Sequence, residues 1–425
     1  MSRFRFVHAA DLHLDTPFSG LARLGESLPA RLRDASLTAF DNLVAATLES
    51  GADLLVLAGD LHDGPERGLR AQLRLRDGLK RLDDAGVQVA IVHGNHDPVA
   101  EGWSAIDAWP GNVTIFPPDE VAAVPLRRDG RELARIYGIS YARRETRDNL
   151  ARRFPAESDA PFAIGLLHAN VGANAEHGAY APCELADLRA ADIDYWALGH
   201  IHAHAILAEG RPWAVYPGVL QGRSPKPSEQ GAKGAVIVDV ADSQVRAVTF
   251  RPLDVVRFET CTLDVAGLGD LGALQDRLQA EAEAAVAAAG ERPLILRARL
   301  TGRGAVHGAL RRAGGPEDLV AALQESEGGA ARVWWDRIVD ATGPALDLDA
   351  IRRRGDMSAE LVARVAALQA DPEARRAFFQ RHAGSGSDRR VRPFLADGDP
   401  AEAEAAALEA ALYEALDRLE PEAEG

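Results

Sequence analysis

Residues 54–97 read LLVLAGDLHDGPERGLRAQLRLRDGLKRLDDAGVQVAIVHGNHD: an apolar run, an amphipathic run and a second apolar run. The two apolar runs predict buried strands, and the stretch 69–86 between them predicts a helix that ends at Gly86. Elements that alternate in this way are typical of an α/β domain with buried sheets. Each strand leads into a polar block, GD at Asp60 and GNHD at His96.

The same alternation continues over the first 250 residues and changes at about residue 251. A strand–helix–strand pattern then covers 257–302, and a further strand is predicted at 332–340. Residues 356–382 and 401–420 predict helices. We therefore expect three regions: an α/β domain over 1–250, a small α+β cap over 251–345, and a helical region over 346–425 with a linker near 383–400.

The composition is that of an ordinary globular protein, with 425 residues, 47% of them hydrophobic and 26% charged. Two cysteines, Cys183 and Cys261, exclude a disulfide framework and a cysteine-rich zinc module. No apolar run is long enough for a membrane span and no signal peptide is evident, so we expect a cytoplasmic protein without a membrane partner.

The net charge of −16 argues mildly against a nucleic-acid partner, but its distribution weakens that argument. Residues 396–425 hold ten acidic residues and one arginine. Residues 351–395 hold ten arginines against five acidic residues. An arginine-rich segment of this kind can bind DNA, or it can form the solvent-exposed faces of helices.

Five predicted strands end in side chains that can bind metal. Because strand ends of an α/β sheet line one edge, residues far apart in sequence should converge there. Imidazole, carboxylate and amide donors together suit Mn, Fe or Zn. Seven ligands are too many for one ion, so we expect two ions that share a carboxylate and hydrolyse a phosphate ester. The side chains are Asp11, His13, Asp60, Asn95, His168, His200 and His202.

The five blocks DLH, GDLHD, GNHD, H and GHIH resemble the signature of calcineurin-like metallophosphoesterases over roughly residues 5–205. The runs HAADLHLDTPFSGL (8–21) and YPGVLQGRSPKPSEQGAKG (216–234) resemble the YhaO-type DNA repair exonucleases. These are relatives of SbcD, the nuclease subunit that works with an SMC-like ATPase. The resemblance implies a four-layer α/β sandwich, two packed sheets flanked by helices, followed by a small cap.

The resemblance also implies a role for each residue of the motifs. His96 matches the catalytic histidine, which is not a ligand, and we expect Asp97 to orient it. Asp63 is expected beside the ligands, and Arg223 to contact a phosphate. His62 departs from the aromatic residue common in relatives. One metal would take Asp11, His13 and His202, the other Asn95, His168 and His200, with Asp60 as the bridge.

These observations favour a Mn-dependent DNA exo- or endonuclease in DNA repair, acting with an SMC-like ATPase (SbcC/YhaN-type), with a homodimer as a further expectation. The alternative is a small-molecule phosphodiesterase or phosphatase, for example of cyclic nucleotides, because the metal centre does not define the substrate. A non-catalytic assembly module is disfavoured by the complete ligand set. The final helix carries a stripe that could fold back on its own domain or dock on a partner: Leu408, Leu412, Leu416 and Leu419.

Overall fold

The structure is a computed structural model. It describes residues 3–18, 34–64, 68–100, 104–106, 108–172, 180–290, 292–312, 314–326, 332–382 and 400–419. The chain divides into two compact units, one of 1–261, 280–297 and 322–337, the other of 262–279, 298–321 and 338–425. This division runs through the predicted cap, so the boundaries at 250 and 345 remain predictions. Most of the predicted linker lies outside the described residues.

The first sheet has six strands in the order β12-β11-β1-β2-β3-β4. The four strands from β1 to β4 run parallel, whereas β11 and β12 are antiparallel additions at the β1 edge. The strands are β1 (Arg3–Ala9), β2 (Leu54–Ala58), β3 (Gln88–Val92), β4 (Val113–Ile115), β11 (Gly234–Ala241) and β12 (Gln244–Pro252).

The second sheet also has six strands, in the order β5-β6-β7-β8-β10-β9. Its centre, from β6 to β10, is parallel, and the two edge strands are antiparallel. The strands are β5 (Ala122–Arg128), β6 (Arg131–Gly138), β7 (Ala163–His168), β8 (Tyr195–Gly199), β9 (Ala205–Ala208) and β10 (Trp213–Tyr216).

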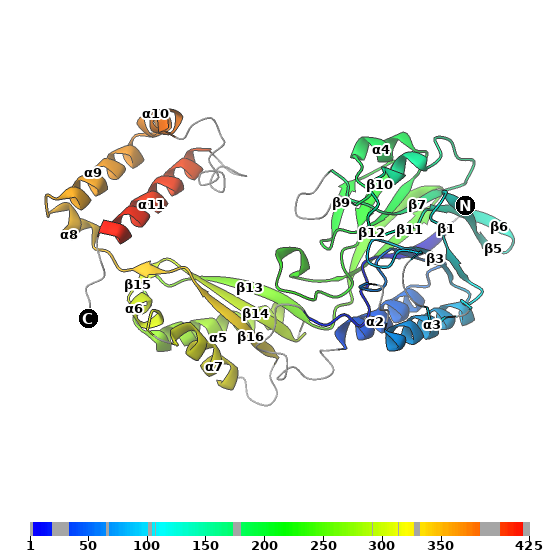
Figure 1. The fold of residues 1–425 in the computed structure, drawn as a ribbon, viewed down its shortest axis with the longest axis horizontal. Coiled ribbons are helices and arrows are strands. Elements are labelled where there is room, and N and C mark those ends of the chain that lie inside the picture. Colours follow the sequence, from blue (N-terminus) through cyan, green and yellow to red (C-terminus); the bar gives the residue numbers. More distant parts are fainter. Residues whose placement is uncertain are drawn as a thin grey trace. The chain divides into compact units, whose positions relative to one another are not determined.

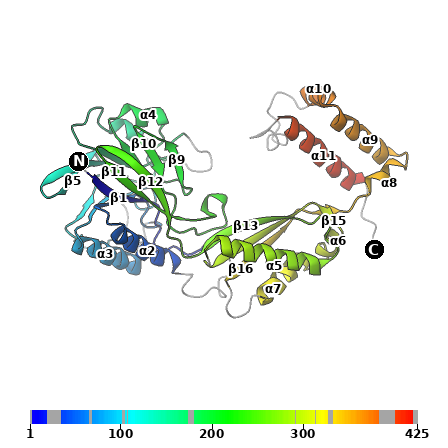
Figure 2. The same ribbon diagram turned by 180° about the vertical axis from the view of Figure 1, so that it is seen from behind.

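Three apolar clusters hold the layers together. Helices α2 (Ala35–Glu49) and α3 (Leu69–Asp84) cover the outer face of the first sheet (Figure 1). The inner faces of the two sheets share a core that includes Phe6 and Ile164. On the far side, α4 (Leu185–Ala190) covers the second sheet (Figure 2). The short helix η1 (Leu150–Arg153) contributes to the same cluster. The predicted four-layer sandwich is confirmed.

Within the two six-stranded sheets, the strands that the sequence pattern missed are β4, β5, β9 and β12. All four lie at sheet edges, and β4 is in addition only three residues long. In β12 the side chains alternate between exposed and half-buried, so no apolar run marks the strand. Edge strands bury one face at most, which is why hydrophobic patterning is weak there.

The strand–helix–strand prediction after residue 255 is confirmed. β13 (Arg257–Asp264), β14 (Leu294–Thr301) and β16 (Val333–Asp340) form a three-stranded sheet in that order. The start of β13 is buried, since Phe258 packs with Ile295 and Trp334. The remaining elements are α5 (Leu271–Ala288), β15 (Arg303–Gly304), α6 (Val306–Leu310), α7 (Gly315–Ser326) and β17 (Gly343–Pro344).

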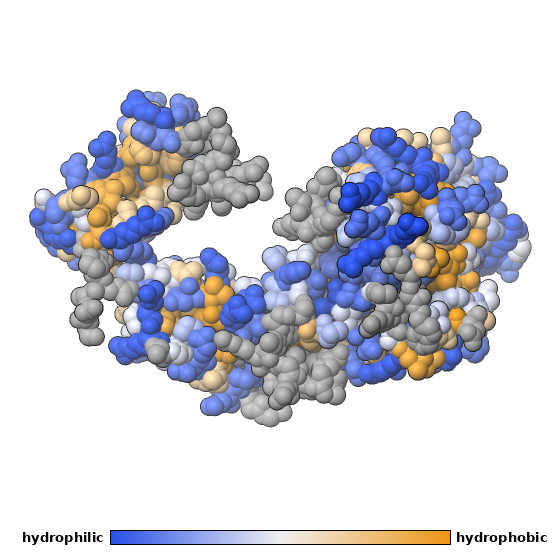
Figure 3. All heavy atoms as spheres, in the orientation of Figure 1, coloured by the Kyte–Doolittle hydropathy of each residue, from blue (hydrophilic) through white to orange (hydrophobic). Residues whose placement is uncertain are grey.

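The described residues of the C-terminal region hold four helices: α8 (Leu348–Arg352), α9 (Met357–Ala370), α10 (Pro372–His382) and α11 (Pro400–Leu419). The helix predicted over 356–382 is interrupted at Asp371, because Pro372 is tolerated only in the first turn of a helix. Apolar residues gather between α9 and α11 on the face seen in Figure 3. Leu408, Leu412 and Leu416 are buried there against α9, so the structure supports the fold-back alternative for this stripe.

Leu419, the fourth leucine of the predicted stripe, is 40% exposed and lies outside this contact. Ion pairs from Arg375 to Glu404 and from Arg303 to Asp417 tie α11 to the same unit. Among the described residues, no helix is both long enough and apolar enough to cross a bilayer.

Candidate metal centre

The loops that follow β1 and β2 are joined by backbone hydrogen bonds. The N–H of Asp11 donates to the carbonyl of Gly59, and the N–H of His13 donates to the carbonyl of Asp60, each at 3.0 Å. Asp11, His13, Asp60 and His200 all have positive φ angles, between 42° and 102°. Such backbone is unfavourable for residues with a Cβ and is typical of functional sites. The strand ends therefore hold these side chains in defined directions.

Two glycines of the motifs permit the close approach of these loops. A Cβ at Gly94 would lie 2.3 Å from Oδ1 of Asp60, and one at Gly199 would lie 1.8 Å from the carbonyl oxygen of Ala58. Neither contact is sterically possible, so any side chain would push the β3 and β8 loops away from β2. The glycines in GNHD and GHIH are thus required by packing around the site.

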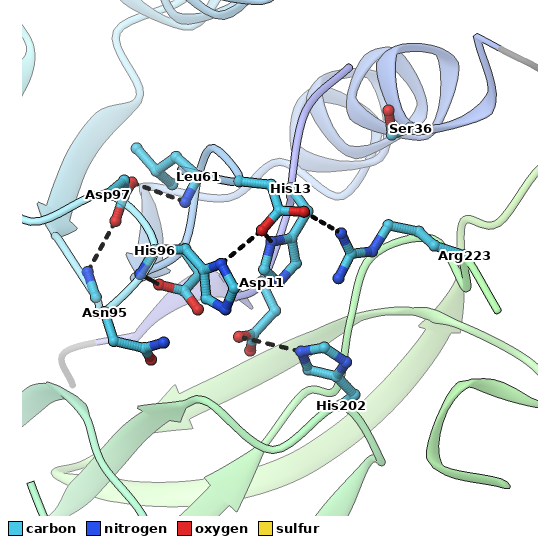
Figure 4. Close-up of polar contacts among 12 residues, drawn as sticks. Asp11, His13, Ser36, Leu61, Asn95, His96, Asp97, His202 and Arg223 are labelled. Atoms are coloured by element: carbon cyan, nitrogen blue, oxygen red, sulfur yellow. Dashed lines mark hydrogen bonds and ion pairs between the residues drawn. The ribbon is translucent and has the colours of Figure 1, made fainter. Parts of the chain in front are cut away.

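Asp11, His13 and His202 form the first cluster of potential ligands, with one ligand atom from each within 4.8 Å of the others. Figure 4 shows these side chains pointing toward one another, with His96 facing the same space. Asp11 and His13 are completely buried. Oδ1 of Asp11 and both ring nitrogens of His13 are buried without a hydrogen-bond partner.

Asp11, Asp60 and His168 form the second cluster, again with ligand atoms within 4.8 Å of one another. Nδ1 of His168 donates to the carbonyl of Ala58 at 2.8 Å, which leaves Nε2 for the site. That nitrogen lies 3.1 Å from Oδ1 of Asn95. The ring of His200 lies 5.2 Å from the ring of His168, but His200 belongs to neither cluster. The structure thus gathers all seven predicted ligands in one place.

The buried charges around this space affect each other's protonation. Burial raises the pKa of Asp11 to about 6, although His168 and His202 oppose the shift. Burial alone would lower the pKa of His168, but the Asp60 carboxylate outweighs it and raises that pKa to about 9. The same histidine holds the pKa of Asp60 well below its usual range, against the effect of burial. Two buried carboxylates therefore need cationic partners here.

The donor set fits divalent metal ions. Buried polar atoms without a hydrogen-bond partner are rare in folded proteins, because each one loses its hydrogen bonds to water. Here the unpartnered atoms of Asp11 and His13 belong to the cluster itself. Carboxylate and imidazole groups in this arrangement are ordinary ligands of Mn, Fe and Zn.

His96 lies beside the clusters and is held by Asp63. Its Nδ1 is 2.5 Å from Oδ1 of Asp63, and its ring centroid is 5.1 Å from that of His13. The other carboxylate oxygen of Asp63 accepts from Nη1 of Arg223 at 3.0 Å. Burial lowers the pKa of His96, but the hydrogen bond to Asp63 outweighs it and the pKa lies above its ordinary value. The side chain of His96 remains 31% exposed, so a substrate can reach it.

The carboxylate that contacts the His96 ring is thus Asp63, and the expectation that Asp97 orients this ring is corrected. Asp97 is fully buried and accepts from the N–H groups of Leu61 and Gly94, each at 2.9 Å. It also lies 3.2 Å from Nδ1 of His93. Asp97 therefore joins the loop after β3 to the loop after β2, as Figure 4 shows for Leu61.

Glu229 is a site residue that sequence reasoning missed. It ends the short helix η2 (Pro227–Glu229), and its Oε1 lies 3.0 Å from Nδ1 of His202. Burial would raise the pKa of Glu229, but the hydrogen bond from His202 outweighs it and lowers the pKa to about 2. The residue lies in a loop without hydrophobic periodicity, and the run SPKPSEQ carries no metal-ligand spacing.

An open cleft of about 490 Å³ adjoins the first cluster. His96 and His202 are among its lining residues, and Arg223 and Lys226 contribute positive charge. Hydroxyl groups add hydrogen-bonding capacity at Thr16, Ser224 and Ser228. Cations and hydroxyls beside a buried acidic cluster are suited to an anionic ligand that bridges to metal.

The pattern of strand-end ligands agrees with a family comparison. Residues 4–204 match the model of calcineurin-like phosphoesterases. This part of the chain is a calcineurin-like phosphoesterase domain. Residues 258–343 match the middle domain of metallophosphoesterase YhaO. The two matches confirm the family resemblance of the motifs and of the YhaO-like runs.

The alignments with two curated relatives are longer than the phosphoesterase domain. The uncharacterized metallophosphoesterase YhaO of Bacillus subtilis is 38% identical over 63% of this chain and 65% of its own length. The DNA double-strand break repair protein Mre11 of Haloferax volcanii is 28% identical over 62% of this chain and 55% of its own length. The chain thus spans less than two thirds of either relative.

Among solved structures, a dimetal phosphatase from Danio rerio is 12% identical and covers 58% of this chain and 99% of its own, with a TM-score of 0.34. A similarity this low adds nothing to the assignment.

Proposed function

We propose that this chain hydrolyses phosphodiester bonds with two bound divalent ions, and that its substrate is DNA. The observation that carries the proposal is His96, held by Asp63 and partly exposed, beside a buried cluster of carboxylates and imidazoles. A histidine beside metal ligands, with cations next to it, suits cleavage of an anionic ester.

Manganese is the metal we propose, with iron or zinc as alternatives. When bound, two such ions clamp the attacking and leaving oxygens of an in-line displacement and lower the pKa of a coordinated water. The residues that would hold them are Asp11, His13 and His202 for one ion, Asn95, His168 and His200 for the other, and Asp60 for both.

The chain's own residues would act on the phosphate and the leaving group. With Nδ1 of His96 held by Asp63, Nε2 is the ring atom left to protonate or hydrogen-bond the leaving oxygen. Arg223 and Lys226 line the same cleft and would neutralise the phosphate charge. Asp63 contacts both His96 and Arg223, so it sets the distance between these two functions.

DNA as the substrate rests on the relatives and on the arginine-rich segment. The Mre11 relatives are named as DNA double-strand break repair proteins. Residues 351–395 carry ten arginines against five acidic residues. We propose an exo- or endonuclease in DNA repair, with an SMC-like ATPase as its partner and a homodimer as its assembly. Because Leu408, Leu412 and Leu416 of α11 are buried in their own unit, we propose that the partner binds at another surface.

A small-molecule phosphodiesterase is the second candidate. A cleft of about 490 Å³ falls within the usual range of small-ligand sites. The net charge of −16 also repels long polyanions.

Competition separates the two candidates. With manganese present, turnover of bis-p-nitrophenyl phosphate is measured while DNA is added at increasing concentration. We expect DNA to inhibit this turnover and to be degraded. If added DNA leaves the turnover of bis-p-nitrophenyl phosphate unchanged, DNA is excluded as the substrate and a small phosphodiester is favoured.

A further inference from the structure

Glu229 makes two hydrogen bonds that join parts of the site otherwise separate in the chain. One carboxylate oxygen lies 3.0 Å from Nδ1 of His202, and the other accepts from the backbone N–H of Arg223 at 2.7 Å. The residue is only 5% exposed. A buried carboxylate is stable only when its oxygens are paired in this way.

We propose that Glu229 is a positioning residue that fixes the ring of His202 and the turn bearing Arg223 in one arrangement. The proposal rests on the two-metal function above. Because a carboxylate only accepts, Nδ1 of His202 donates to Glu229, and Nε2 is the ring nitrogen that faces the ligand cluster. That nitrogen lies 3.9 Å from Oδ1 of Asp11, within the first ligand cluster.

The backbone around Glu229 is anchored independently of His202. Its N–H donates to the carbonyl of Lys226 at 2.9 Å, and Nζ of Lys233 donates to the carbonyl of Ser228 at 2.8 Å. Two residues later, the N–H of Gly231 donates to the carbonyl of Phe258 at 3.0 Å. The carboxylate is therefore the fixed partner, and the imidazole ring is the group that it orients.

The second contact extends this control to the catalytic histidine. Glu229 shapes the turn at Arg223, the guanidinium of Arg223 contacts Asp63, and Asp63 contacts His96. One carboxylate thus supports a metal ligand directly and the leaving-group histidine through Arg223. Loss of the Glu229 carboxylate should weaken metal binding, whereas loss of the Arg223 guanidinium should leave metal binding unchanged.

Isothermal titration of manganese into the metal-stripped full chain tests this proposal without any substrate. We expect wild type to bind two ions and Glu229→Gln to bind one of them about 10- to 100-fold more weakly, as when outer partners of metal-ligating histidines are removed. Arg223→Lys keeps the backbone N–H and should bind both ions as wild type does. Glu132→Gln removes a carboxylate paired with Arg135 on β6 and serves as the control.

Thermal melting of the metal-free variants establishes that they fold. If Glu229→Gln is unfolded, Glu229→Asp takes its place, because it keeps the charge but withdraws the carboxylate by one methylene. Wild-type manganese affinity at both sites in a folded Glu229 variant would overturn the proposal. A wild type that binds two ions yet leaves DNA intact would overturn only the DNA substrate, whereas a wild type that binds no ion would overturn both.

Discussion

At the scale of single residues, the carboxylate that contacts the His96 ring is not the one next to it in the sequence. Asp97 follows His96 directly, yet its carboxylate joins two loops through Leu61 and Gly94. Asp63 comes much earlier in the chain, in the loop after β2, and provides the carboxylate at the His96 ring. Motif spacing identified the residues, but the contacts depend on how the β2 and β3 loops meet.

We expect Asp63→Asn to lower kcat by about 10- to 100-fold with little change in KM, because the amide cannot stabilise a protonated His96 as the carboxylate does. The measurement is steady-state hydrolysis of bis-p-nitrophenyl phosphate with manganese. Asp77→Asn is the control, since Asp77 is exposed on α3 and pairs with Arg76. Unchanged kcat in Asp63→Asn would show that this carboxylate does not support His96.

At the scale of elements, the sequence predicts well what is buried and poorly what is not. Three of the strands that lead into ligands, β2, β7 and β8, are buried along their whole length, so they appear as continuous apolar runs. Their polar ends could therefore be assigned to one sheet edge. Glu229 could not be, because its place beside His202 depends on the fold of the loop after β10 rather than on any period.

Gly199 tests how tightly the strand ends are packed. Gly199→Ala would place a Cβ 1.8 Å from the carbonyl oxygen of Ala58, so β8 and β2 would have to separate. We expect a melting temperature lower by about 10 °C or more, or no folded protein. Gly111→Ala is the matched control, because a Cβ there meets nothing within 4 Å. Equal melting temperatures for both variants would contradict the close approach.

At the scale of the whole molecule, the C-terminal region forms its own core. Leu412 and Leu416 are buried with Val362 and Val365, so the apolar stripe that the sequence left open between two roles is already occupied. Helical periodicity predicted the stripe but not its partner, because a leucine face looks the same whether it packs on its own domain or on another chain.

Leu412→Asp should displace α11, since it places a charge in this core. We expect aggregation on mild heating, measured by light scattering, while hydrolysis of bis-p-nitrophenyl phosphate at about 25 °C is unchanged. Leu419→Asp places the same charge on an exposed leucine of the same helix and should behave as wild type. Scattering that is equal in the two variants would show that α11 does not cover this core.

Cleavage of end-labelled single- and double-stranded DNA by the full chain with manganese tests the central claim most directly. His96→Ala is the test variant, and His382→Ala, an exposed histidine on α10, is its control. We predict that wild type and His382→Ala degrade DNA, and that His96→Ala binds manganese but leaves DNA intact. Equal cleavage by His96→Ala, or intact DNA with a wild type that holds two manganese ions, would contradict the account.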